Sequence, residues 1–218
     1  ELQLDPKRFE PKKVRWAISN AKNQGWSPDD LEANAEGQRG KLSADVYRRY
    51  RKALAANNAL DFDDLLLLPV QLLQQNEQVR GYWYRRFRHV LVDEYQDTNR
   101  TQYELIKLLV TDGKEPQQVD DWSGRSVFVV GDADQSIYSF RAADFTILMG
   151  FQDDFGDKAP DDVTRTMVKL EENYRSTATI LEAANALISN NCERIDKVLR
   201  PMRGEGEFIL LTRCDDEI

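Results

Sequence analysis

The sequence is poor in the side chains that most often bind metals or carry covalent catalysis. Its 218 residues include one histidine, His89, and two cysteines, Cys192 and Cys214. A single histidine leaves almost no room for a His-rich metal site or for a Ser-His-Asp triad. Neither cysteine lies at a metal-ligand spacing. We interpret His89 as a strand-edge residue. The low cysteine content favours a cytoplasmic protein, because the cytoplasm is reducing.

Long apolar runs are also missing. The densest apolar stretch, LLLLPV at 65–70, is interrupted by Pro69, whereas a membrane-spanning helix needs about 20 apolar residues. We therefore expect no membrane partner. A hydrophobic content of 41% with 10% aromatic residues supports a packed core. The first residues, ELQLDPKRFEPKK, contain neither Met nor an apolar signal segment, so we interpret the chain as a piece of a longer protein.

The chain does not carry a net positive charge. Its net charge is −8, which argues against a general electrostatic grip on nucleic acid. The charge is uneven, because residues 1–60 hold 12 basic and 8 acidic residues, a net of +4, and the remainder has a net of −12. Basic residues gather in this front section and at 80–89. They are compatible with a local nucleic-acid groove, although charges of this kind most often form solvated helix faces.

The pattern of apolar residues changes near residue 88. Before it, helical periodicity and cap residues predict a series of helices: 5–25, 27–36, 43–59, 60–76 with a bend at Pro69, and 77–88. After it, short apolar strands alternate with helices: strands at 89–94, 126–132, 166–176 and 206–214, and helices at 99–110, 143–150 and 176–191. This alternation predicts an α/β unit with a parallel sheet, preceded by an all-helical part.

Polar residues follow three of the expected strands. Asp93 and Glu94 follow the first, Asp132 and Asp134 follow the second, and the run 171–175 follows the third. Ligands of open parallel sheets bind beyond the carboxyl ends of the strands. We therefore expect the three strand ends to converge on one crevice.

The same residues match the needs of nucleotide hydrolysis. Mg²⁺ prefers a few carboxylate oxygens together with water and phosphate. A neighbouring carboxylate can orient the attacking water, a glutamine can position it, and an arginine can neutralise developing charge. Asp93, Glu94, Gln135 and Arg175 supply these four parts.

Several motifs resemble those of the UvrD/Rep/PcrA helicases of superfamily 1, and most closely the PcrA type. VDEYQDTN, VGDADQSIYSFRAAD and LEENYRS resemble motifs II, III and IV, and LDFDDLL at 60–66 resembles the return from a helical insertion to the motor core. The resemblance covers nearly the whole chain. It implies a partial RecA-like P-loop NTPase sheet, with a helical insertion at 1–87, the later part of the first motor domain at 88–204, and the start of the second motor domain at 205–218.

The resemblance also implies roles in ATP binding and hydrolysis. Asp93, with Glu94 beside it, would hold Mg²⁺ mainly through water, and Glu94 would be the catalytic base. Gln135 would sense the γ-phosphate. Arg175 would be an arginine finger, and Tyr174 would stack on adenine.

For single-stranded DNA, the resemblance implies contacts from Tyr138, Phe140 and Arg141, because aromatic faces hold bases without reading sequence. Phe140 replaces the family's common Trp, and Ala142 its common Gly. Phe62 is a further candidate for DNA contact. The alternative for Phe62 and its neighbours Asp61 and Asp63 is that they only cap and anchor a helix.

The phosphate cradle G-x-x-x-x-G-K-[ST] is missing from the sequence. The nearest string, AEGQRGKLS at 35–43, has Ala35 and Leu42 at required positions, and we interpret it as a polar turn. We therefore expect the partners to include a P-loop segment and a second motor domain of the same chain, besides single-stranded DNA and duplex junctions. The implied function of the longer protein is that of an ATP-dependent DNA helicase in repair or replication. We expect these 218 residues alone to lack ATPase activity. The alternatives are the motor of an ATP-dependent exonuclease subunit and a non-catalytic DNA- or partner-binding module.

Overall fold

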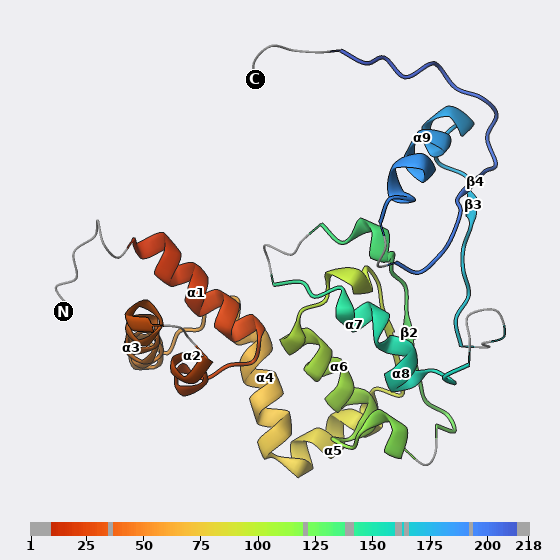
Figure 1. Ribbon diagram of the computed structural model, residues 1–218. Helices are drawn as coiled ribbons and strands as arrows, with labels where there is room; N and C mark the ends of the chain where they lie inside the picture. The colour runs from red at the N-terminus through yellow and green to blue at the C-terminus, as the bar shows by residue number, and fades with distance from the viewer. Residues whose placement is uncertain are drawn as a thin grey trace. The chain divides into compact units, whose positions relative to one another are not determined.

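The structure, a computed structural model, describes residues 10–34, 37–119, 122–137, 142–159, 163, 166–191 and 194–212. The chain divides into two units, Glu1–Phe155 and Gly156–Ile218. Figure 1 shows the course of the chain through its helices and strands. Each unit is described by itself.

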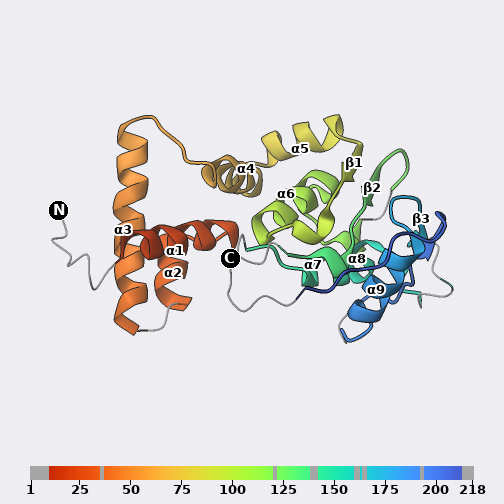
Figure 2. The same ribbon diagram turned by 90° about the horizontal axis from the view of Figure 1, so that it is seen from above.

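Three helices open the first unit: α1 (Pro11–Asn23), α2 (Pro28–Asn34) and α3 (Gly37–Ala56). Figure 2 shows α1 crossing α3, with α2 beside them. Their shared core is built from apolar side chains: Ile18, Ala21, Leu31, Ala44 and Tyr47. Trp16, two residues before Ile18 and so on the other face of α1, is 59% exposed.

The string 35–43 is not the polar turn that the sequence suggested. From Gly37 onward it forms the first turns of α3. Gln, Arg, Lys and Leu are good helix formers, and a single glycine within a helix costs only about 1 kcal/mol. From Gly37 onward the backbone N–H groups of this segment therefore belong to a helix and do not form a loop around a phosphate.

Three further helices form a second layer of the same unit: α4 (Asp64–Gln75), α5 (Glu77–Arg86) and α6 (Arg100–Thr111). Helix α4 continues through Pro69 to its end. Val70, Leu73 and Leu108 form the buried centre of this layer. An N-cap asparagine begins each of the last two helices, Asn76 for α5 and Asn99 for α6.

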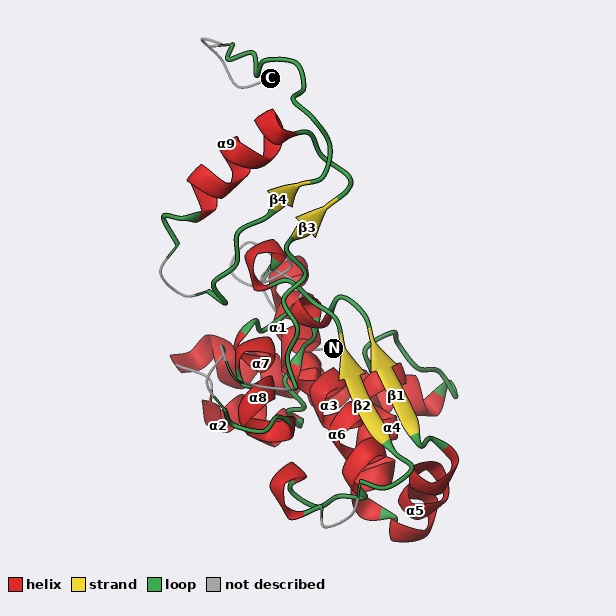
Figure 3. Cartoon of the chain, turned by 90° about the vertical axis from the view of Figure 1, so that its right-hand side faces the viewer, coloured by secondary structure: helices red, strands yellow, loops and turns green. Residues whose placement is uncertain are grey.

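The expected parallel pairing of the first two strands is confirmed. Strand β1 (His89–Val92) pairs with β2 (Ser126–Val129), with His89 opposite Ser126 and Val92 opposite Val129. Figure 3 shows the two strands side by side and pointing the same way. This arrangement brings both carboxyl ends to one edge of the sheet.

One face of this sheet is covered and the other is not, whereas the sequence suggested a strand at 126–132 that is buried on both faces. Val92 and Val129 pack on the cluster of Tyr95, Tyr103, Ile147 and Leu148. Leu91 and Phe128, on the other face, are 72% and 57% exposed. Two short helices, α7 (Thr146–Met149) and α8 (Phe151–Phe155), contribute to the covered side.

Three 3₁₀ turns complete the first unit: η1 (Tyr95–Asp97), η2 (Pro116–Gln118) and η3 (Ala133–Gln135). The turn η1 follows β1 and the turn η3 follows β2, so each strand leads directly into a tight turn.

The second unit contains a smaller parallel pair, β3 (Glu172–Asn173) with β4 (Arg200–Pro201), and helix α9 (Ala178–Ile188). The strand expected at 166–176 is thus reduced to two residues. The strand expected at 206–214 is not formed at 206–212, the part of it that the structure describes. Throughout the described ranges, no helix combines the length and apolar character needed to cross a bilayer.

Candidate functional site

Asp93 and Glu94 lie where β1 turns sharply into η1. Both side chains are exposed. The backbone N–H of Glu94 donates to Asp93 Oδ1 at 2.9 Å. Glu94 itself has φ 50° and ψ 43°, a left-handed conformation that costs a non-glycine residue about 1–3 kcal/mol. The turn aims both carboxylates away from the covered core and toward the sheet edge.

The end of β2 carries a second polar group of side chains. Asp132 Oδ1 accepts a hydrogen bond from the backbone N–H of Asp134 at 3.0 Å, and Asp132 Oδ2 accepts one from Gln135 Nε2 at 2.8 Å. Asp132 therefore caps η3 and orients the exposed Gln135. The parallel register places this group beside Asp93 and Glu94.

Gln96 joins the two groups, and the sequence reasoning missed it. Its side chain is 2% exposed. Its Nε2 donates to Glu94 Oε2 at 2.7 Å, and its Oε1 accepts from the backbone N–H of Asp132 at 3.0 Å. The sequence offered one signal, an amide among acidic residues directly after a strand, but not its burial.

Tyr174 and Arg175 belong to the second unit, where β3 ends. The Asn173 side chain accepts from the backbone N–H groups of Arg175 and Ser176 at 3.0 and 2.9 Å, which fixes the turn. The Tyr174 hydroxyl donates to Glu172 Oε2 at 2.5 Å, and this hydrogen bond raises the pKa of Tyr174. The Tyr174 ring is 68% exposed. Of the five predicted nucleotide residues, the β1–β2 edge itself brings together Asp93, Glu94 and Gln135.

The segment 61–64 has two distinct roles in the structure. Asp61 and Asp64 cap each other's backbone N–H groups, at 2.9 and 3.2 Å, and both accept from the buried Lys22 at 2.7 Å. Asp63 accepts from Asn23 Nδ2 at 3.1 Å. These contacts fit the anchoring interpretation of Asp61 and Asp63, and they add Asp64, which the sequence reasoning did not single out.

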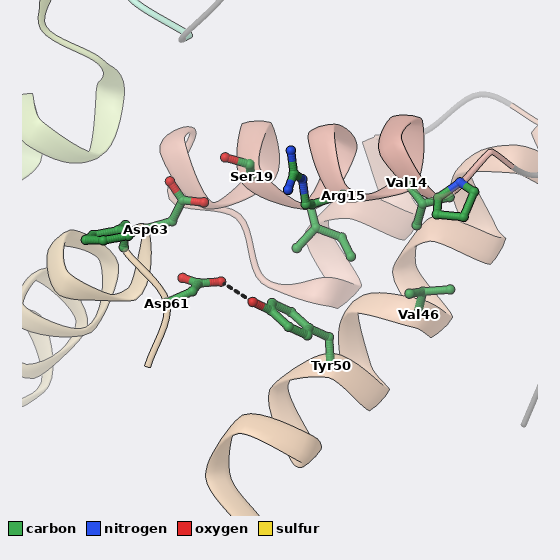
Figure 4. A pocket seen from close by; sticks show the side chains of 10 residues that line it. Val14, Arg15, Ser19, Val46, Tyr50, Asp61 and Asp63 are labelled. Carbon is green, nitrogen blue, oxygen red and sulfur yellow. Dashed lines mark hydrogen bonds between the residues drawn. The ribbon is translucent and has the colours of Figure 1, made fainter. Parts of the chain in front are cut away.

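Phe62, in contrast, anchors nothing, because its side chain is 90% exposed. It lines a cavity of about 730 Å³ between α1, α3 and the start of α4. Figure 4 shows Tyr50 bonded to Asp61 on one side of this cavity, with Val14 and Arg15 of α1 on the other. Phe62 thus shares this cavity with Arg15, and its ring is open to solvent.

The predicted DNA contacts Tyr138, Phe140 and Arg141 lie outside the described residues. Ala142, next to them, has φ 59°. This backbone conformation favours glycine, which gives a physical reason for the glycine common at this position in the family that the motifs resemble.

The donor set at the sheet edge fits Mg²⁺ bound to nucleotide better than a metal caged by protein alone. The described part of the chain contains no group of three or more His, Cys, Asp or Glu residues placed to hold a metal ion. Mg²⁺ is commonly held by one or two carboxylates, with water and phosphate as its other ligands. Asp93 and Glu94 provide such a pair.

Two family models match the chain. The family model of the UvrD/REP helicase N-terminal domain matches residues 1–156, and that of the UvrD-like helicase C-terminal domain matches residues 168–218. The first match covers the β1–β2 edge, and the second covers Tyr174 and Arg175.

Three curated relatives are similar over the full length of the chain. The chain is 39% identical over 217 residues to the ATP-dependent DNA helicase PcrA of Bacillus subtilis. It is 43% identical over 220 residues to the ATP-dependent DNA helicase UvrD1 of Mycobacterium leprae, and 44% identical over 224 residues to that of Mycobacterium tuberculosis. Each match covers 100% of this chain but only 27% of the relative. On the strength of both family matches, the chain belongs to the UvrD/REP helicase family.

Proposed function

We propose that the chain is part of the motor of an ATP-dependent DNA helicase, which moves along single-stranded DNA and unwinds duplex at junctions during repair or replication in the cytoplasm. The observation that carries this proposal is the edge of the β1–β2 sheet. There Glu94 and Gln135 lie on adjacent strand ends and are joined through Gln96 and Asp132. The names of the relatives support the same activity.

In this proposal Asp93 and Glu94 face the phosphates of ATP. Asp93 would hold Mg²⁺ mainly through water, and Mg²⁺ bound there would neutralise charge on the phosphate oxygens. Glu94 would take a proton from the attacking water while the water oxygen bonds to the γ-phosphorus and the bond to ADP breaks. Its exposed position at the sheet edge, away from the apolar core, suits a base that must reach water.

Gln135, Tyr174 and Arg175 would complete nucleotide recognition. Gln135 would sense the γ-phosphate, and its amide is already oriented by Asp132. The exposed ring of Tyr174 would stack on adenine. Arg175 would neutralise charge that develops on the γ-phosphate, as an arginine does in other phosphoryl-transfer sites.

Single-stranded DNA would contact Phe62, together with Tyr138, Phe140 and Arg141. Stacking of a base on an aromatic ring combines with nearby cations to bind a single strand without reading its sequence. Phe62 meets both conditions, because its ring is exposed and Arg15 lines the same cavity.

The phosphate cradle would come from another segment of the same protein. The string closest to such a cradle is wound into α3. A P-loop segment and a second motor domain would therefore be partners of this chain, and the 218 residues alone would not turn over ATP.

The test uses the longer protein that contains this chain and measures DNA-stimulated ATP hydrolysis and ATP binding. Glu94→Gln should abolish turnover and preserve binding, because the amide keeps the shape of the side chain but cannot take a proton. Glu182→Gln, on the exposed side of α9, makes the same chemical change away from the site and should leave both unchanged. Normal turnover by Glu94→Gln would remove the catalytic role of this edge.

A further inference from the structure

Gln96 bridges the two strand ends of the candidate site from a buried position. We propose that Gln96 is the positioning residue that couples the catalytic carboxylate Glu94 to the γ-phosphate sensor Gln135. This inference rests on the proposed function and adds a residue to it. The structure shows a continuous series of hydrogen bonds from Glu94 Oε2 to Gln96, from Gln96 to the backbone of Asp132, and from the Asp132 side chain to Gln135.

The orientation of the Gln96 amide follows from its partners. An ionised carboxylate such as Glu94 can only accept a hydrogen bond, and the backbone N–H of Asp132 can only donate one. The amide nitrogen must therefore face Glu94 and the amide oxygen must face Asp132. The glutamine amide supplies this donor and this acceptor on one planar group without carrying a charge.

The hydrogen bonds of the series are short, and its central residue is shielded from solvent. Its three hydrogen bonds measure 2.7, 3.0 and 2.8 Å, and Gln96 itself is 2% exposed. Two more hydrogen bonds hold the same turns together, from Ser136 Oγ to the carbonyl of Gln96 at 3.4 Å and from the Tyr95 N–H to the carbonyl of Val130 at 2.9 Å. A displacement of η3 would therefore pull directly on the Gln96 amide and on Glu94.

The bond to Gln96 occupies only one oxygen of Glu94. Within the described ranges, no hydrogen bond involves Oε1 of Glu94, so that oxygen remains available to a water molecule. Gln96 thus fixes the rotation of the carboxylate and leaves its other oxygen directed at solvent. When Gln135 meets or loses a phosphate, the change reaches Glu94 through Asp132 and Gln96.

A purely structural role for Gln96 is the competing explanation, because any buried amide must find partners. The variant Gln96→Glu distinguishes the two. It keeps an acceptor for the Asp132 N–H but places a second carboxylate against Glu94. It thus removes the donor that faces Glu94, while the hydrogen bond from the Asp132 backbone N–H can persist.

The first experiment measures kcat and KM for ATP in the longer protein near neutral pH. Gln96→Glu should lower kcat by about 10- to 100-fold, with KM nearly unchanged, because a misplaced base costs about this much. A merely structural role would lower the thermal midpoint of unfolding but leave kcat per folded protein unchanged. Gln74→Glu, an exposed site on α4, adds the same charge and should match the parent in both constants.

The second experiment removes the link without adding charge, which also keeps the test possible if Gln96→Glu does not fold. Gln96→Met has a similar shape but neither polar group. Its effect on kcat is compared with that of Gln135→Ala and with the double variant. If Gln96 acts through Gln135, the double variant should be no worse than the more damaged single variant. Binding of a fluorescent ATP analogue should show that each variant still binds nucleotide, and the thermal midpoint of unfolding should show that each variant is folded.

The outcomes separate this inference from the proposed function. If Glu94→Gln retains full turnover, the proposed function fails whatever Gln96 does. If Glu94→Gln is inactive but Gln96→Glu keeps the kcat of the parent, or the effects of Gln96→Met and Gln135→Ala simply multiply, then the coupling role alone is overturned.

Discussion

The ammonium group of Lys22 lies 2.7 Å from Asp64 Oδ1, and both side chains are buried. The same nitrogen lies 2.7 Å from Asp61 Oδ2. The carbonyl of Lys22 accepts a hydrogen bond from Thr101 Oγ1 at 2.7 Å. Residue 22 therefore connects the end of α1 with the start of α4 and the first turn of α6.

Lys22→Met should destabilise the fold by about 3–5 kcal/mol, because it leaves two carboxylates without their buried cation. Urea unfolding followed by circular dichroism measures this loss. Lys13→Met is the matched control: it breaks the exposed ion pair of Lys13 with Glu10, in which Lys13 is 82% exposed, and should change stability little. A loss below about 1 kcal/mol for Lys22→Met would show that the triad is not an anchor.

The stability of the fold should depend on pH through Asp61. Burial acts to raise the pKa of Asp61, but hydrogen bonds from Lys22, the Asp64 backbone and Tyr50 outweigh it, so the pKa falls below its ordinary 3.8. A carboxyl with a lowered folded-state pKa stabilises the fold above its unfolded-state pKa and loses this effect as pH falls through the folded-state pKa. Acid titration of unfolding should show a loss beginning near pH 4, and Asp61→Asn should weaken that dependence.

Asn99 should matter more than an ordinary N-cap. Its side chain accepts from the Gln102 N–H at 2.9 Å and also donates to Asn23 Oδ1 at 2.6 Å, which ties α6 to α1. Asn76 only caps α5, through Val79 at 3.0 Å. Asn76→Ala should cost about 1 kcal/mol, and Asn99→Ala about 1 kcal/mol more because the half-buried Asn23 loses this hydrogen bond. Equal losses in thermal unfolding would argue against the second role.

Gly131 stands close to the Gln96 amide. A Cβ at this position would lie 2.8 Å from Gln96 Oε1 and 3.2 Å from the Gln96 backbone nitrogen. Gly131→Ala should therefore push the amide off the Asp132 N–H and cost about 1–3 kcal/mol of stability. ATP turnover in the longer protein should fall as well. Gly204→Ala, where a Cβ would meet nothing within 4 Å, should affect neither measurement.

Phe62→Ala should weaken binding of single-stranded DNA by about tenfold or more, because stacking of one base contributes about 1–3 kcal/mol. The ring is 90% exposed, so the melting temperature should not change. Fluorescence anisotropy with labelled oligonucleotide measures the affinity. Phe208→Ala removes a ring that is 98% exposed and serves as the control, and an unchanged affinity for Phe62→Ala would remove Phe62 from the DNA path.

The parts of the fold that depend on local pattern could be predicted from the sequence. Apolar periodicity located α6 and α9, and the apolar runs ending in carboxylates located β1 and β2 and their shared edge. The expectation that Asp93 and Glu94 lie at the same sheet edge as Gln135 came from the rule that neighbouring parallel strands end on the same side. These predictions needed only the spacing of residues along the chain.

The parts that depend on distant contacts could not be predicted. Gln96 looks like a solvent-exposed amide in sequence, and its burial depends on Asp132, 36 residues away. Trp16 is an apolar residue within α1, yet it is exposed because it lies two residues from Ile18 and so on the opposite face of the helix. The string 35–43 contains glycines that suggest a turn, but from Gly37 onward it belongs to α3, whose Ala44 and Tyr47 lie in the core.

The domain limits suggested by the motifs stay predictions. The contacts of the chain divide it after Phe155, and the match to the C-terminal family model begins at residue 168. Both positions precede the limit at residue 204 that the motif resemblance favoured. Helix α9 and the β3–β4 pair lie between residues 168 and 204.

Leu91 and Phe128 are partners in the β1–β2 register, and both turn away from the core into solvent. Burying either side chain fully would contribute about 1.5–3 kcal/mol. Together they form an exposed apolar stripe on a sheet whose strand edges are open to further pairing. We therefore expect these 218 residues by themselves to aggregate, to an extent that depends more on protein concentration and detergent than on temperature.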